Sequence, residues 1–305
     1  MQWGHIKTLF ILSFLILNIY LVSAFVDRQQ DVGYLDNQEL PVEDQLAAEN
    51  ITYDDVEEQV TESTYISATQ KMLSKDDLNE LDNMDGQKIE VFDNSKITAE
   101  IESAVSIPDN ATDEVIEDLV QSYVLYGEEY SLWGWNEEFN ILVFFQSKEG
   151  RDIFYNENGL LLVYLNENNE MTHYTQTILG ESEVQGDLVA LNQPTQVIGI
   201  LYKGNYLYRD DNVSEVKMGY YSRISAEGIQ VFAPTWKVTV NKERNHFVNA
   251  IEGIVYDNEE HEFLMEVMNN NAMQIMTLNE DNDLRSSILP VLNERLEMDN
   301  RSETE

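Results

Sequence analysis

The side chains that most often carry out chemistry are sparse in this sequence. Its 305 residues contain no Cys and only four His, at positions His5, His173, His246 and His261, with no two at helical spacing. No Gly-x-Ser-x-Gly, His-Glu-x-x-His or glycine-rich phosphate-binding motif is present. Acidic pairs are too abundant to nominate an acid/base couple. The sequence therefore predicts a protein that is not an enzyme and uses no cofactor.

One acidic run has residue types that could bind a cation. Glu259, Glu260, His261 and Glu262 are consecutive, and carboxylates are common ligands for hard cations. In a chain with 57 Asp and Glu against 18 Lys and Arg, however, such a run is usually a solvated surface. We expect no metal site here.

Aromatic residues could line a ligand groove in two places. One group comprises Trp133, Trp135, Phe139, Phe144 and Phe145, and the other is the pair Tyr220 and Tyr221. Because polar residues alternate with these aromatics, we favour the interpretation that they belong to the core of a sheet.

A single amide interrupts an apolar stretch near the N-terminus. Residues 9–26 carry no charge and, with their flanks, can cross a hydrocarbon core of about 30 Å as a helix. Asn18 lies within it, and an amide in lipid gains by hydrogen bonding to another helix. The hypothesis is a partner-binding face at spacings of three, four and seven residues, formed by Ile11, Phe14, Leu15, Asn18, Leu21, Val22 and Phe25. The alternative is that the helix simply tolerates Asn18.

The flanks of this stretch predict its orientation. Lys7 precedes it, Arg28 follows it, and no Lys or Arg occurs from residue 29 to residue 70. By the positive-inside rule, the N-terminus is cytoplasmic and the remainder extracytoplasmic, which makes a single-pass protein of the cell membrane. A cleaved signal peptide is the alternative, since Val22, Ser23 and Ala24 have cleavage-site spacing. The apolar run continues past Ala24, which favours an uncleaved anchor.

The formal net charge of −39 restricts the possible partners. Nucleic acid and anionic lipid headgroups would repel such a chain, so neither is expected as a ligand. We interpret the acid excess mainly as an adaptation to external salt or high pH. Without Cys, the exported domain must be held together by packing.

Composition and periodicity divide the chain into six segments. We predict a cytoplasmic stub (1–8), a transmembrane helix (9–26), an acidic stalk with a short helix (27–70), two α+β units (71–180 and 181–256) and an acidic C-terminal extension (257–305). The short helix is expected at residues 41–49, and part of residues 262–276 is expected to be helical.

Each α+β unit is predicted to contain a helix followed by an antiparallel meander. Capping residues and apolar stripes predict helices at 74–83, 112–126 and 194–203. Short turns separate the expected strands at 139–146, 152–155, 160–165, 171–178, 213–223, 228–240 and 245–255. Apolar residues change parity at Pro234, which predicts a β-bulge there. Helices beside antiparallel strands indicate an α+β fold.

Three patches of the sequence resemble the YycI family. They are the N-terminal segment with Trp3, Lys7, Thr8, Leu17 and Asn18, residues 45–53, and the strand segments 216–221, 231–241 and 247–253. The resemblance runs from Met1 to about Val255. Residues 256–305 look like an extension that the family pattern does not explain.

The resemblance implies a non-catalytic membrane protein of low-GC Gram-positive bacteria. Its implied partners are the WalK (YycG) sensor histidine kinase and a YycH-like single-span protein, contacted through membrane helices, in the WalK/WalR (YycG/YycF) system that governs cell-wall metabolism. The chain could also pair with a second copy of itself. The alternative function is an exported, membrane-tethered binding or inhibitory module whose sheet captures a peptide or glycan.

Overall fold

The computed structural model describes residues 7, 10–18, 20–21, 41–53, 60–108, 110–222, 228–257 and 259–302. The chain divides into two compact units, residues 1–52 and residues 53–305. In the first unit, residues 10–18 and 20–21 are helical, and α2 (Val42–Ala48) follows Pro41. The short helix predicted at residues 41–49 is therefore confirmed.

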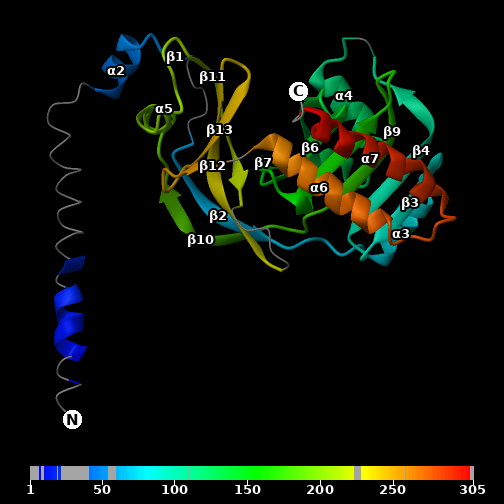
Figure 1. Ribbon diagram of the computed structural model, residues 1–305, viewed down its shortest axis with the longest axis horizontal. Helices are drawn as coiled ribbons and strands as arrows, with labels where there is room; N and C mark the ends of the chain where they lie inside the picture. Colours follow the sequence, from blue (N-terminus) through cyan, green and yellow to red (C-terminus); the bar gives the residue numbers. More distant parts are fainter. Residues whose placement is uncertain are drawn as a thin grey trace. The chain divides into compact units, whose positions relative to one another are not determined.

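The second unit is built on one long mixed sheet (Figure 1). Its strands follow the spatial order β10-β2-β12-β11-β7-β6-β8-β9-β4-β3, with β5 beside β6 and with β13 between β12 and β14. The strand bounds are β1 (Thr52–Tyr53), β2 (Glu62–Ala68), β3 (Gln87–Phe92), β4 (Lys96–Ser106), β5 (Tyr130–Asn136), β6 (Ile141–Lys148), β7 (Arg151–Phe154), β8 (Leu160–Leu165), β9 (Glu170–Thr177), β10 (Glu183–Ala190), β11 (Asn212–Tyr221), β12 (Gln230–Val240), β13 (Arg244–Asn249) and β14 (Val255–Tyr256).

One parallel contact joins two antiparallel halves of this sheet. β11 pairs with β7 in parallel at Tyr220 with Ile153 and at Tyr221 with Phe154. A Cβ at Gly219 would overlap the Phe154 ring, so glycine permits this close approach. The other neighbouring strands on the path are antiparallel, which confirms the α+β class.

Local sequence signals explain the helices before residue 204. α3 (Lys75–Asp82) has a capping box in which Ser74 N donates to Asp77 Oδ2 (2.7 Å) and Asp77 N donates to Ser74 Oγ (3.2 Å). α5 (Pro194–Lys203) has the predicted bounds. α4 (Asp113–Gln121) ends earlier than predicted, because the chain turns back on it: a Cβ at Gly127, in the short 3₁₀ helix η1 (Gly127–Glu129), would overlap the Gln121 backbone.

Strands β6 and β8 are buried on both faces. On one face Phe144 and Leu161 pack in a cluster that includes Ile116 and Val120 of α4. On the other face the cluster contains Phe145 and Leu162 of the strands, together with Leu264, Val267, Met268, Ala272, Ile275, Leu284, Ile288 and Leu292 of α6 (Glu260–Ile275) and α7 (Asp283–Ser302). Figure 1 shows α6 and α7, in orange and red, side by side across the strands.

The C-terminal extension is therefore more ordered than predicted. The helix expected within residues 262–276 is confirmed as α6, but residues 283–302, expected to be an acidic tail, form α7. Leu284, Ile288 and Leu292 recur every four residues, and all three are buried. Arg295 anchors the helix, since Nη2 donates to Leu165 O of β8 (2.6 Å). The abundance of charged residues in the segment masked this apolar stripe.

Two further expectations differ from the structure. Residues 62–68, predicted to belong to the acidic stalk, form β2, which pairs with β10 and β12 and buries Ile66. The bulge predicted at Pro234 is wrong, because β11 pairs with β12 without a register shift from Glu215 to Tyr221. Pro234 instead lies where β12 changes its second partner from β2 to β13. Residues 232–236 are all buried, so side chains on both faces of the strand are covered. The alternation of apolar residues therefore cannot show which face points to the core.

Candidate functional site

The partner-binding face predicted in the N-terminal segment is only partly described by the structure. Residues 10–18 and 20–21 are helical, and four side chains of the face, those of Ile11, Phe14, Leu15 and Leu21, are exposed. Val22 and Phe25 lie outside the described residues. Among the described residues, no helix has both the length and the apolar character needed to cross a membrane. The span of residues 9–26 stays a prediction.

Asn18 makes a local hydrogen bond within this helix. Its Nδ2 donates to Phe14 O, one turn earlier, at 2.9 Å. Such a bond satisfies one side-chain donor without any partner helix. The described residues provide no donor to Asn18 Oδ1, which can still accept a hydrogen bond across an interface.

The aromatic residues nominated from the sequence lie mainly in the core, as favoured. Phe139, Phe144 and Phe145 are at most 1% exposed, whereas Trp135 lies near the surface. Trp133 contacts aromatic rings from both halves of the sheet. Its ring centroid lies 5.2 Å from that of Phe145 and 6.1 Å from that of Phe247. Tyr221 stacks on Tyr256 with centroids 4.5 Å apart. These rings connect the two halves of the sheet.

Glu260, from the acidic run considered as a metal ligand, is bound by neighbouring side chains. Its Oε2 accepts hydrogen bonds from Trp133 Nε1 (2.9 Å) and Tyr155 OH (3.1 Å), and its Oε1 accepts one from Asn136 Nδ2 (3.0 Å). His261 Nδ1 lies 3.2 Å from Glu138 Oε2. No cluster of three or more potential metal ligands occurs in the part of the chain that the structure describes. The run therefore fastens the start of α6 to the aromatic cluster.

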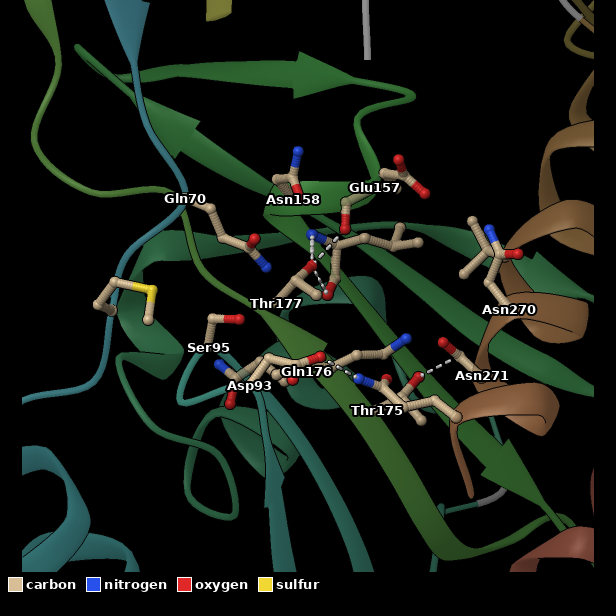
Figure 2. A pocket seen from close by; sticks show the side chains of 15 residues that line it. Gln70, Asp93, Ser95, Glu157, Asn158, Thr175, Gln176, Thr177, Asn270 and Asn271 are labelled. Atoms are coloured by element: carbon tan, nitrogen blue, oxygen red, sulfur yellow. Dashed lines mark hydrogen bonds between the residues drawn. The ribbon is translucent and has the colours of Figure 1, made fainter. Parts of the chain in front are cut away.

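The structure also contains a polar pocket that no residue pattern in the sequence predicts. It has a volume of about 440 Å³ and lies between the β3–β4 turn, the 3₁₀ helix η2 (Glu157–Gly159), β9 and α6 (Figure 2). Thr177 Oγ1 donates to Glu157 O (2.6 Å) and accepts from Leu160 N (3.1 Å), which fixes one wall. The lining residues come from distant parts of the sequence, so no local motif could predict the pocket.

Lys96 is the one cationic side chain in the lining of this pocket. Desolvation lowers the pKa of its ammonium group to about 8, while the nearby Glu157 and Asp93 carboxylates oppose this shift. Lys96 begins β4 directly after a tight turn at Asp93 and Asn94, whose φ angles are 48° and 53°. The fold thus holds a partly buried ammonium group beside a cavity.

Asn271 enters the same pocket from α6 and is 1% exposed. Figure 2 shows its amide turned toward Thr175, and Nδ2 donates to Thr175 Oγ1 at 3.1 Å and to Tyr164 OH at 3.3 Å. Its Oδ1 has no hydrogen-bond partner among the described residues. A buried amide oxygen without a donor is uncommon and favours a polar group beside it.

Comparisons with known proteins assign the chain to a protein family. The model of the family described as YycI protein matches residues 29–251. The search of curated proteins gave no match. Among solved structures, the chain is similar to an uncharacterized protein from Eubacterium rectale, with 12% identity, a TM-score of 0.41, and coverage of 69% of this chain and 91% of that chain. The family match spans most of the 305 residues, and the chain therefore belongs to the YycI family, which is associated with the WalK/WalR two-component system.

Proposed function

We propose that this protein is a non-enzymatic, membrane-anchored regulator of a WalK-type (YycG-type) sensor histidine kinase. The observation that carries the proposal is the family match over residues 29–251. Residues 9–26 anchor the chain in the cell membrane with the N-terminus in the cytoplasm, and the α+β domain lies outside. The uncharged sequence of this segment supports the placement.

The regulatory contact is made between membrane helices. The face around Asn18 packs against the kinase and a YycH-like single-span protein, and Asn18 Oδ1 accepts a hydrogen bond from one of these helices. If the helices pack more favourably against one of two kinase conformations by a few kcal/mol of free energy, the ratio of these conformations shifts by more than tenfold. The extracytoplasmic domain modulates this equilibrium from outside the membrane.

The direct test is in-cell crosslinking from a photoreactive residue at position 18. A matched control carries the same residue at Ile16, which lies on the opposite side of the helix. We expect the position 18 probe to capture a sensor histidine kinase or a YycH-like protein, identified by mass spectrometry, and the Ile16 probe to capture much less. Equal capture from both positions, or lipid adducts alone, would contradict a specific helix contact.

Replacing residues 9–26 by an unrelated apolar helix separates this function from a tethered binding module. A regulator that acts through its helix loses control of kinase output on this exchange, whereas a tethered binding module retains its function. The pocket lined by Lys96 and Asn271 is the observation that favours the module as the second candidate. Cleavage after Ala24 in the mature protein would also favour it.

A further inference from the structure

The pocket between β9 and α6 is assembled from segments that lie far apart in the sequence. Lys96 and Thr175 belong to the region that matches the family model, while Asn270, Asn271 and Gln274 come from α6, beyond the end of that match at residue 251. Figure 2 shows the α6 side chains facing the β9 side chains across the cavity. The C-terminal extension thus completes a concave site on the core of the domain.

Lys96 differs from the other partly buried lysines of the domain. Lys71, Lys148 and Lys237 have carboxylate oxygens at 3.6, 2.7 and 2.6 Å, respectively. The ammonium group of Lys96 has no ion pair within 4.0 Å and no hydrogen bond with the residues that the structure describes. In a chain with 57 acidic and 18 basic residues, an ammonium group without a carboxylate in contact is unexpected. Burying it without a partner costs free energy that a bound anion would offset.

The remaining lining restricts the anion. Asp93 and Glu157 lie near enough to Lys96 to affect its pKa, so a doubly charged phosphate would meet two carboxylates and a single cation. A monoanion fits this balance better, because one charge pairs with Lys96 and the repulsion is halved. The net charge of −39 also disfavours multivalent anions, although salt screens it beyond about 8 Å.

The neutral groups of the pocket call for hydrogen-bonding atoms beside the charge. The wall carries the amides of Gln70, Asn158, Asn270, Asn271 and Gln274 and the hydroxyls of Ser95 and Thr175. Each of these amides and hydroxyls includes an oxygen that can accept a hydrogen bond. Hydroxyl or N–H groups on a ligand would satisfy such acceptors, whereas a purely apolar acid would leave them unpaired.

We propose that this pocket binds a small organic monocarboxylate that also carries hydroxyl or amide groups, with the carboxylate paired to Lys96 Nζ and the donors placed against the amides of α6. An acidic sugar and an N-acylated amino acid share this chemistry. The volume of about 440 Å³ accommodates either. The proposal is independent of the helix contact in the membrane.

Calorimetric titration of the full-length protein in detergent micelles tests the proposal. The probes are glucuronate and N-acetylalanine, with glucose and N-acetylalaninamide as their uncharged counterparts. We expect at least one carboxylate to bind with a Kd of about 1 mM or below, and its uncharged counterpart to bind at least about tenfold more weakly. The carboxylate that binds identifies the source. Binding of neither carboxylate, or equal binding of the uncharged counterparts, would overturn the proposal.

Two lysine variants assign the binding to the pocket. Lys96→Met keeps the aliphatic stem and removes the charge, and we expect it to weaken carboxylate binding at least about tenfold. Lys75→Met, at the exposed start of α3, is the matched control and leaves binding unchanged. Circular dichroism establishes that both variants are folded. Unchanged binding by folded Lys96→Met would refute the site.

A pH series on the unmodified protein gives a second readout that does not depend on a variant. The pKa of Lys96 is lowered to about 8, so its charge is lost between pH 7 and pH 9; Asp93 and Glu157 are the ionisable groups beside it in the lining. Carboxylate binding therefore weakens severalfold over this range. Binding that is constant from pH 7 to pH 9 would contradict the pairing with Lys96.

Discussion

The two faces of β6 and β8 are equally buried but are covered by helices of different origin. α4 covers one face and lies inside the region that matches the family model, whereas α6 and α7 cover the other face and follow that region. Phe144 and Phe145 are neighbours on β6, point to opposite faces and are both almost fully buried. The comparison shows that helices beyond the family match cover one of the two faces of these strands.

Removing residues 257–305 tests this comparison most severely. The deletion would uncover the apolar face of β6 and β8 and remove buried residues that include Leu264, Met268, Ile288 and Leu292. At about 2 kcal/mol for each side chain, the loss is comparable to the total stability of a domain. We expect loss of cooperative thermal unfolding and strong binding of a hydrophobic dye. A truncated protein that melts like the full chain would show that the extension is dispensable.

Single alanine substitutions compare the two faces directly. Ile288→Ala on α7 and Ile116→Ala on α4 both remove buried aliphatic atoms. If both faces belong to one core, each variant loses about 2–5 kcal/mol of unfolding free energy. Urea denaturation measures both values. A loss below about 0.5 kcal/mol for Ile288→Ala alone would mean that α7 is only loosely docked.

The polar attachment of α6 is tested at Glu260. Glu260→Gln turns one oxygen, which accepts from Trp133, Tyr155 or Asn136, into an amide donor and removes the charge that strengthens these bonds. We expect a loss of about 1–3 kcal/mol in unfolding free energy and a change in tryptophan fluorescence. Glu262→Gln, on the exposed side of α6, is the control and changes stability by less than about 0.5 kcal/mol. Equal effects of the two variants would contradict the assigned role of Glu260.

The contact between β9 and α7 predicts a smaller, pH-dependent effect. Desolvation lowers the pKa of His173 to about 4, and its Nε2 lies 3.2 Å from Ser287 Oγ of α7. Below pH 6.5 the unfolded chain binds a proton at this histidine that the folded protein refuses until about pH 4. Stability therefore falls as pH decreases through this window, by up to about 1.4 kcal/mol per pH unit. Replacing His173 by Gln removes this contribution, so the stability difference between the variant and the unmodified protein should change between pH 6.5 and pH 5. A constant difference would contradict the assignment.

Capping residues, prolines, glycines and apolar runs correctly predicted the helices and strands in which they occur. The proline and glycine at the ends of residues 194–203, and Ser74 before α3, predicted helices that the structure confirms. The apolar run at residues 160–165 matches β8. Predictions that depended on which face is covered were less successful: the parity change at Pro234 reflects burial on both sides, and β2 was hidden by the acidic residues before it.

The two candidate sites, the face around Asn18 and the pocket beside Lys96, also differ in whether the sequence alone could predict them. An uncharged run with one amide can be read from consecutive residues, so the face around Asn18 could be proposed from the sequence. The pocket could not, because Lys96, Thr175 and Asn271 meet only after strand pairing and helix docking. No residue type or spacing near Lys96 indicates that its ammonium group makes no contact with a carboxylate of the described residues.

The sequence by itself determined the α+β class, most of the helix starts and the family, because caps, turns and apolar periodicity act within a few residues of one another. Only the tertiary structure decided that residues 62–68 join the sheet, that α6 and α7 complete the core, and that the Lys96 ammonium group lies beside a cavity with no carboxylate of the described residues in contact. The physical reason is that burial depends on the sum of all neighbours. A strand with apolar residues on both faces requires two covers, and its own residues do not specify which segment of the chain supplies each one.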